Sequence, residues 1–188
     1  MTYLVRHYKQ RRLFRDPPPD RRALLEYLEK AQARVTTHFQ TLNASGPIQV
    51  ILIACSAGKL DHDAPAKDLY TGQLFRKSRA YAEKTEQPYF ILSALHGLLE
   101  PTKVIGPYNY TLKKQRLRER EAWGTRVVDS IVWHVPQAST ITLLAGSDYA
   151  DPIESKLKLK GFKIDRPLKG LGIGQQQQKL IELTRAIP

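Results

Sequence analysis

The sequence predicts an α/β protein with three layers, in which helices flank a mostly parallel central sheet. Three short apolar runs indicate the strands, at residues 48–54, 89–94 and 140–145. The first is almost wholly apolar and rich in β-branched residues, which is typical of a strand buried on both faces of a parallel sheet. Small or polar residues follow each run directly. If the three strands are parallel neighbours, these polar endings share one crevice at the carboxyl edge of the sheet.

Composition sets limits on the class of protein. A chain of 188 residues is long enough for one domain with a proper core. The formal net charge of +12 favours a polyanionic partner. Nucleic acid is expected rather than an anionic membrane surface, because no long basic amphipathic helix carries an aromatic face. No apolar run approaches the roughly 20 residues of a membrane span. A single cysteine cannot form an internal disulfide, which favours a reducing cytoplasm.

Residues 1–46 are expected to form a basic arm and an N-terminal helix, ahead of an α/β domain at residues 47–188. The arm, up to residue 22, carries seven cationic side chains, and Pro17, Pro18 and Pro19 stiffen it into an extended form. A floppy tail is an equal alternative. Asp20 can cap the helix that follows, because apolar residues recur at helical spacing from Leu24 onward.

The segment after the first strand contains Asp61, His62 and Asp63. Adjacent side chains rarely converge on one ion, and no second His or Cys lies at a fitting spacing, so a polar loop is expected here and no metal site. A helix follows at about residues 73–85, with a basic face that includes Arg76 and Lys77.

Beyond the second strand, Gly97 permits a backbone turn, and residues 104–110 are expected to form a loop whose aromatic rings can stack. A long helix is expected at about residues 111–133. The charge run of Lys113, Lys114 and Arg116 near its start is either a solvated face or a set of phosphate contacts, and the scarcity of acidic residues favours phosphate.

After the third strand, Asp151 and Pro152 predict the start of a short helix that stops at Gly161. A last strand is possible at residues 162–164, and a final helix starts near Gln175. The glycines of residues 170–174 lack the dinucleotide-binding spacing, but they would let backbone amides approach a phosphate. The expected contacts to a DNA backbone are therefore Arg76, Lys77, Lys113, Lys114, Arg116, Lys169 and Gln175.

Several separate motifs carry a family resemblance across residues 48–181. They are Cys55-Ser56 with Lys59, Asp68-Leu69-Tyr70, residues 91–98 (ILSALHGL), Pro107-Tyr108, Leu144-Ala-Gly with Tyr149, and Gly170-Leu-Gly-Ile-Gly. Together they resemble a bacterial and phage domain family of undefined function, related in pattern to the YaaA peroxide-stress proteins. That wider group is similar to uracil-DNA-glycosylase-type α/β folds and to the glycosylase-like domains of tRNA-base-exchange enzymes.

The resemblance implies DNA binding, with base excision as the activity, because some similar proteins excise modified bases from phage DNA as a defence. It implies a monofunctional N-glycosylase that needs no cofactor and acts on a base flipped out of double-stranded DNA. A monomer is compatible with this reading. One position departs from the pattern: an Asp often follows the Pro-Tyr pair, and here the residue is Asn109.

Cleavage of an N-glycosidic bond needs a positioned water or carboxylate near the sugar, and a donor to the departing base. Asn109 can orient a water through its amide oxygen, or it can cap the helix expected from Thr111. His96 can donate to the base or contact a phosphate, or it can be a structural residue beside Gly97. Asp148 can orient water or bind a base amino group, or it can be an ordinary polar loop residue.

The other strand-end residues are candidates for substrate binding. Ser56 and Lys59 suit phosphate or base contacts at the start of the next helix, with plain capping as the alternative. The rings of Tyr70, Tyr108 and Tyr149 can stack on a flipped base, although loop packing explains at least one of them. Cys55 fits a small buried residue better than a nucleophile. The remaining members of the set are Ser93, Gly97 and Ser147.

The function expected from all of this is a DNA glycosylase that removes a modified base. A DNA-binding stress protein without catalysis is the alternative. A hydrolase of free nucleosides is weaker, because such an enzyme has little use for so much positive surface.

Overall fold

The computed structural model describes residues 46–187, so the predicted basic arm and N-terminal helix lie, up to residue 45, outside the described part of the chain. The central sheet has five strands in the order β4-β3-β1-β6-β7. Their bounds are Gly97–Leu99, Tyr89–Ser93, Gln49–Ala54, Thr140–Leu144 and Lys163–Asp165 in that order. All neighbouring pairs are parallel except β3 with β4. The expected α/β class with a mostly parallel sheet is confirmed.

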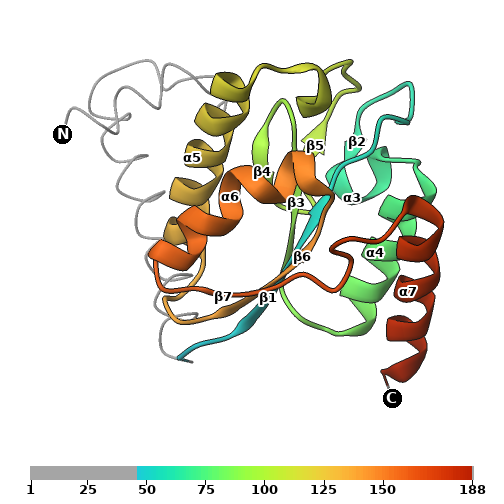
Figure 1. Ribbon diagram of the computed structural model, residues 1–188. Coiled ribbons are helices and arrows are strands. Elements are labelled where there is room, and N and C mark those ends of the chain that lie inside the picture. The colour runs from blue at the N-terminus through green and yellow to red at the C-terminus, as the bar shows by residue number, and fades with distance from the viewer. Residues whose placement is uncertain (1–45, 188) are drawn as a thin grey trace, which may run out of the picture. The chain divides into compact units, whose positions relative to one another are not determined.

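Helices cover both faces of the sheet (Figure 1). The short α3 (Ala66–Leu69), α4 (Gln73–Lys84) and α7 (Ile173–Ala186) lie over one face. The other face is covered by α5 (Leu117–His134) and α6 (Ser147–Leu159). Side chains of β1 alternate between the two cores, as the pleat requires. Val50 and Leu52 belong to one apolar cluster, and Ile51 and Ile53 belong to the other.

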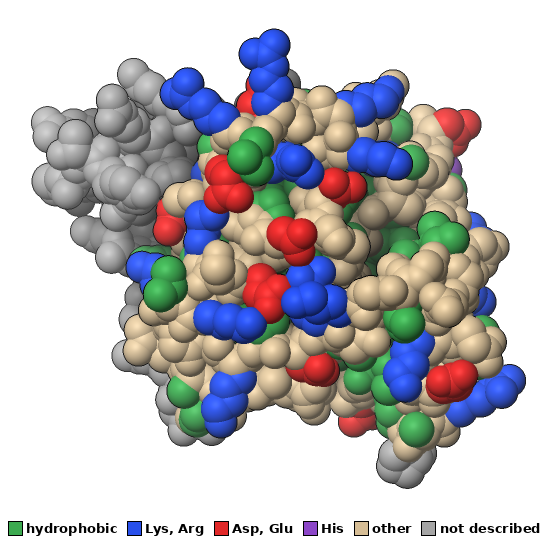
Figure 2. Space-filling view, viewed as in Figure 1, with side chains coloured by type: hydrophobic (Ala, Val, Ile, Leu, Met, Phe, Trp, Pro, Cys, Tyr) green, Lys and Arg blue, Asp and Glu red, His purple; other side chains and the backbone are tan. Residues whose placement is uncertain are grey.

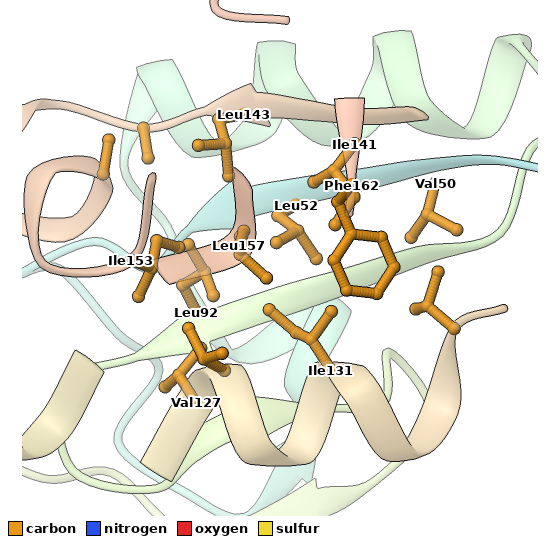
Figure 3. Close-up of a cluster of buried hydrophobic side chains, with 14 of the residues drawn as sticks. Val50, Leu52, Leu92, Val127, Ile131, Ile141, Leu143, Ile153, Leu157 and Phe162 are labelled. Carbon is orange, nitrogen blue, oxygen red and sulfur yellow. The ribbon is translucent and has the colours of Figure 1, made fainter. Parts of the chain in front are cut away.

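The core beneath α5 and α6 holds the largest buried side chain, Trp123. Its indole Nε1 donates to the carbonyl oxygen of Ser93 at 2.9 Å, which ties α5 to the end of β3. The stripe of Trp123, Val127 and Ile131 expected from the sequence is buried here. Figure 3 shows a large part of this cluster, which includes Val50, Leu52, Leu92, Ile141, Leu143, Ile153, Leu157 and Phe162.

The expected helix at residues 111–133 starts later than predicted. Residues Leu112–Lys114 form a separate 3-10 helix, η1, and α5 starts at Leu117 after Arg116 as its N-cap. The side chain of Thr111 accepts from the backbone N–H of Lys113 and caps η1. Gln115 and Arg116 have extended backbone and separate η1 from α5. Leu112 on η1 is buried, at 1% exposed, while Leu117 at the start of α5 is 67% exposed.

The predicted start of α6 at Asp151 and Pro152 is wrong. The helix begins at Ser147, directly after β6, and Pro152 lies inside it. Ala150, Ile153 and Leu157 are fully buried at helical spacing, so burial fixes the helix from its first turn. Proline costs a helix one hydrogen bond, and tertiary packing overrides that loss here.

Smaller elements complete the described fold. β2 (Ala64–Pro65) and β5 (Val104–Ile105) pair as a two-stranded antiparallel sheet in segments that the sequence indicates as loops. The last strand and α7 both lie within two residues of their expected positions. Among the described residues, none of the helices has the length and apolar character needed to cross a membrane.

Candidate functional site

The polar endings of β1, β3 and β6 meet at one edge of the sheet, because the three strands are parallel neighbours with β1 in the middle. The chain leaves β1 for α4 on one face and leaves β6 for α6 on the other. This arrangement makes a topological switch point between β1 and β6, where open α/β sheets bind ligands. Cys55 and Tyr149 follow these two strands, and Cys55 Sγ lies 3.2 Å from Tyr149 Oη.

A chain of hydroxyl groups runs through the interior of this edge. The phenol oxygens of Tyr70 and Tyr108 are 2.9 Å apart, and Tyr108 Oη lies 2.7 Å from Ser93 Oγ. Ser93 Oγ also accepts from the backbone N–H of His96 at 3.0 Å. Burial raises the pKa of Tyr70 to about 12 and raises the pKa of Tyr108 and of Tyr149 further. All three phenols are therefore neutral hydrogen-bonding groups at pH 7.

The rings of these tyrosines differ in accessibility. Tyr70 is 1% exposed and packs on Phe75 at 5.0 Å between centroids, so the expectation that it stacks on a flipped base is wrong. Tyr108 and Tyr149 are half-buried. Tyr108 has the edge-to-face partner His96 at 5.2 Å, and Tyr149 has Trp123 at 5.6 Å. Both rings are fixed by packing, which limits how a base can approach them.

Lys59 and Ser56 organise the segment after β1. Lys59 Nζ donates to the carbonyl oxygens of Ser56 and Ala57 at 3.1 and 3.2 Å, and it lies 4.1 Å from the centroid of the Tyr108 ring. Burial lowers the pKa of Lys59. Ser56 Oγ accepts from the backbone N–H of Gly72, the N-cap residue of α4, at 3.1 Å. Ser56 therefore holds the start of the next helix, which is the capping alternative foreseen for it.

Two of the three catalytic candidates lie on the surface beside Tyr108. His96 and Asn109 are both exposed, and Asn109 follows Tyr108 directly. The helix-capping alternative for Asn109 is wrong, because Thr111 fills that role. The expectation of a loop for Asp148 is also wrong: it lies in the first turn of α6. Its side chain is 40% exposed, and Arg120 Nη1 lies 3.2 Å from Asp148 Oδ1.

Arg120 is a site residue that sequence reasoning missed. It is one of several cations in the run before and within α5, and its spacing does not distinguish it from the others. Its contact with Asp148 depends on the packing of α5 against α6. The Arg120 guanidinium offsets the negative charge of Asp148 at the switch point.

The remaining expected binding residues fall at the same edge of the sheet. Gly97 has φ +75, a left-handed conformation that favours glycine, and it begins β4. Ser147 is exposed at the start of α6. Among the described residues, no group of three or more His, Cys, Asp and Glu side chains is arranged to hold a metal. Asp61 and His62 pair with each other, at 2.8 Å.

Basic side chains gather near this edge. Figure 2 shows Lys and Arg side chains along the margin of the molecule formed by η1 and the start of α5. Lys113, Lys114 and Arg116 are exposed there. Arg76 is exposed on α4, and Lys169 is exposed before α7. These five residues are placed where a polyanion can reach them.

The other two expected backbone contacts, Gln175 and Lys77, lie on α7 and α4. The side-chain oxygen Oε1 of Gln175 accepts from the backbone N–H of Gly172 at 2.9 Å, so Gln175 caps α7. Lys77 lines a groove of about 310 Å³ between α4 and α7. The other groove residues are Ala80, Lys84, Leu180, Ile181, Thr184 and Arg185. This groove is separate from the strand endings.

A family model described as a family of unknown function (DUF6884) matches residues 50–182. That range includes β3, β6, all of β1 except Gln49, and every described candidate of the strand endings. None of the curated proteins matches the chain.

Proposed function

Since the chain belongs to this family of unknown function (DUF6884), we propose a function for it from the site: a DNA glycosylase that flips out and excises a modified base. The observation that carries the proposal is the position of His96 and Asn109. Both are exposed, and both are anchored to the ends of parallel strands through Tyr108 and Ser93. A donor and a water-orienting amide on such a rigid support suit chemistry on an extruded nucleotide.

The proposed reaction is hydrolysis of the bond between the base and C1′ of the sugar. Asn109 Oδ1 accepts a hydrogen bond from a water molecule and aims its oxygen at C1′. As the N-glycosidic bond breaks, the base leaves with the bonding electrons and takes a proton from His96. The water oxygen bonds to C1′ and loses a proton to the Asp148 carboxylate. The products are the free base and an abasic site.

DNA is the proposed partner because exposed cations lie on η1, which packs against α6, and near the start of α4. Lys113, Lys114 and Arg116 lie before α5, whose residue Arg120 contacts Asp148 at the switch point. Phosphate contacts of this kind supply most of the affinity for DNA and set its position. A hydrolase of free nucleosides would gain nothing from these side chains.

The wider proposal includes a fold of the uracil-DNA-glycosylase type, with the basic arm before it, and a role in antiviral defence in the cytoplasm. The mostly parallel sheet, the helices on both faces and the site at the carboxyl edge support this reading. Phage genomes that carry modified bases are the proposed substrates, because excision from them spares unmodified host DNA.

The test compares genomic DNA from phages with modified bases against unmodified DNA. Each is incubated with the protein and then treated with alkali, which cuts at abasic sites. We expect cuts only in a modified genome, and a loss of activity of about 100-fold in Asn109→Ala and in His96→Ala. Gln137→Ala, an exposed polar position in the turn before β6, is the matched control and keeps full activity.

Two results would contradict the proposal. If DNA is bound but none of the modified genomes gains abasic sites, the protein is a DNA-binding protein without catalysis. If excision persists in both Asn109→Ala and His96→Ala, the chemistry lies elsewhere in the chain.

A further inference from the structure

We propose that Lys59 is a nucleophile that acts after excision: its amine attacks C1′ of the abasic sugar and leads to cleavage of the DNA strand. This inference rests on the proposed function, because it needs an abasic sugar in the same crevice. It adds a lyase step to an enzyme that the family resemblance implies to be monofunctional.

The position of Lys59 carries the inference. Its backbone forms an isolated antiparallel bridge with Tyr70, and Thr71 N donates to Gly58 O at 3.0 Å, so the chain on both sides is fixed. The side chain turns back toward β1 and places Nζ 4.1 Å from the Tyr108 ring centroid. His96 contacts the same ring at 5.2 Å between centroids. Lys59 Nζ therefore contacts the same ring as His96, the residue proposed to protonate the base.

The surroundings of Nζ favour a reactive amine. Within the described residues Lys59 has no carboxylate partner, whereas Lys156 and Lys158 pair with Glu121 and Glu154. Its hydrogen-bond acceptors are two neutral carbonyl oxygens. Partial burial lowers the pKa of Lys59, so a larger share of its amine is unprotonated at neutral pH than in an exposed lysine. Desolvated lysines serve as nucleophiles toward carbonyl groups for this reason.

The chemistry balances without a co-reactant. An abasic sugar opens to an aldehyde at C1′, and the neutral Lys59 amine adds to that carbon. Loss of water gives a neutral imine between Nζ and C1′, and a proton taken up from solvent water converts it to an iminium ion. His96, neutral after it has protonated the base, removes a proton from C2′, and the bond from C3′ to the 3′-phosphate breaks with its electrons on the phosphate. Water then releases the lysine, leaving an unsaturated aldehyde on the cut strand.

The test uses an oligonucleotide duplex with a pre-formed abasic site, so that it does not depend on base excision. Borohydride reduces an iminium ion to a stable amine, which joins the protein to the DNA covalently. We expect the full chain to form this adduct and to cut the duplex without alkali. Peptide mapping of the adduct places the DNA on Lys59.

Lys59→Arg is the decisive variant, because arginine keeps a cation near Tyr108 and cannot form the iminium ion. We expect its adduct yield and strand cleavage to fall at least 100-fold, with DNA affinity and melting temperature unchanged. Lys103→Arg, an exposed position before β5, is the matched control and behaves as the unchanged protein.

The outcomes separate this inference from the proposed function. An adduct that persists in Lys59→Arg, or the absence of any adduct in the unchanged protein, overturns the role of Lys59. If abasic sites still form in modified DNA in that case, the glycosylase proposal stands alone. An adduct on pre-formed abasic DNA without any excision keeps Lys59 as the nucleophile and overturns the proposed glycosylase.

Discussion

Tyr108 is the residue on which the candidate site depends most. Its hydroxyl joins Ser93 at the end of β3 to the buried Tyr70, and its ring contacts both Lys59 and His96. Asn109 is the next residue along the chain. A change at Tyr108 therefore alters the position of three candidate groups together, although its phenol has no direct role in the proposed reaction.

We predict that Tyr108→Phe destabilises the protein by about 1–2 kcal/mol, because Tyr70 and Ser93 each lose a hydrogen-bond partner in the interior. Urea unfolding measures this change. Tyr110→Phe is the control: Tyr110 is 40% exposed, and its variant should match the unchanged protein. Equal stabilities of the two variants would show that the chain of hydroxyl groups contributes nothing to the free energy of unfolding.

At the scale of single residues, the sequence predicts the position of the strand endings better than the surroundings of the individual side chains. Small and polar residues directly after buried runs identify the strand endings. The burial of Tyr70 was not predictable, because its depth depends on Phe75 of α4 and on Tyr108 from a distant loop. The pairing of Asp148 with Arg120 was not predictable for the same reason, because the two residues lie 28 positions apart in the sequence.

At the scale of elements, α5 and α6 approach each other closely at a glycine. A Cβ atom placed on Gly124 would lie 2.4 Å from the carbonyl oxygen of Pro152. That oxygen belongs to the backbone, so the two helices would have to separate to admit the methyl group. The position of Asp148 and of its partner Arg120 depends on this helix pair.

We predict that Gly124→Ala destabilises the protein by about 1–3 kcal/mol, through overpacking of α5 against α6. Gly174→Ala in α7 is the matched control, because a Cβ there meets nothing within 4 Å. Alanine favours helix at such a position, so this control should be as stable as the parent or up to about 1 kcal/mol more stable. Thermal unfolding of the two variants and the parent measures these differences. A Gly124→Ala variant as stable as the parent would contradict the close contact between the helices.

Glu154 links α6 to the segment after β7 through an ion pair with Arg166. Its carboxylate accepts from Lys158 Nζ and from Arg166 Nη1, each at 2.6 Å. The hydrogen bonds from Lys158 and then from Arg166 lower the pKa of Glu154 from 4.5 to about 2. Since the folded state prefers the ionised form, this stabilisation is fully present above about pH 4.5 and is lost as pH falls toward about 2.

We predict that Glu154→Gln costs about 1–2 kcal/mol at pH 7, and that the difference from the unchanged protein shrinks between about pH 4.5 and pH 2. Urea unfolding at several pH values measures it. Glu182→Gln is the control, since its Lys179 partner is 4.0 Å away on the surface. A difference for Glu154→Gln that stays constant with pH would contradict the role of these ion pairs.

Most helices and strands were predictable from apolar spacing, and the failures have a common cause. Pro152 and the Asp before it form a typical helix start, yet buried residues on both sides of them fix one continuous helix. The turn at Gln115 between η1 and α5 likewise follows from the burial of Leu112. In both places tertiary packing overrides a local signal.

At the scale of the whole molecule, the charge gathered over η1 and the start of α5 should control DNA affinity. We predict that changing Lys113, Lys114 and Arg116 together to Gln makes the negative slope of log affinity against log salt concentration shallower by about 2.7, or about 0.9 for each lost phosphate contact. Lys160 and Lys163, exposed at the far end of α6 and on β7, provide a control double variant. An equal effect of the two variants would mean that no particular face binds DNA.

The arrangement of the sheet was predictable in part. Three buried runs with polar endings indicate parallel neighbours, which the structure confirms, whereas the order of the strands, with β1 between β3 and β6, was not predicted. The antiparallel β4 and the small β2–β5 sheet were not predicted, because strands of two or three residues carry too little periodicity to stand out from loops.

The central place of β1 also affects how the chain is made. Beside this strand, Ile48 and Ser139 are hydrogen-bonded although 91 positions separate them. A ribosome adds that stretch in roughly 5–20 s, and during this time one side of β1 has no neighbour. A nascent chain stopped before β6 thus carries an unpaired apolar edge, of the kind that chaperones capture and that drives aggregation. Fragments that end before residue 139 should therefore collect in inclusion bodies, whereas the full chain folds.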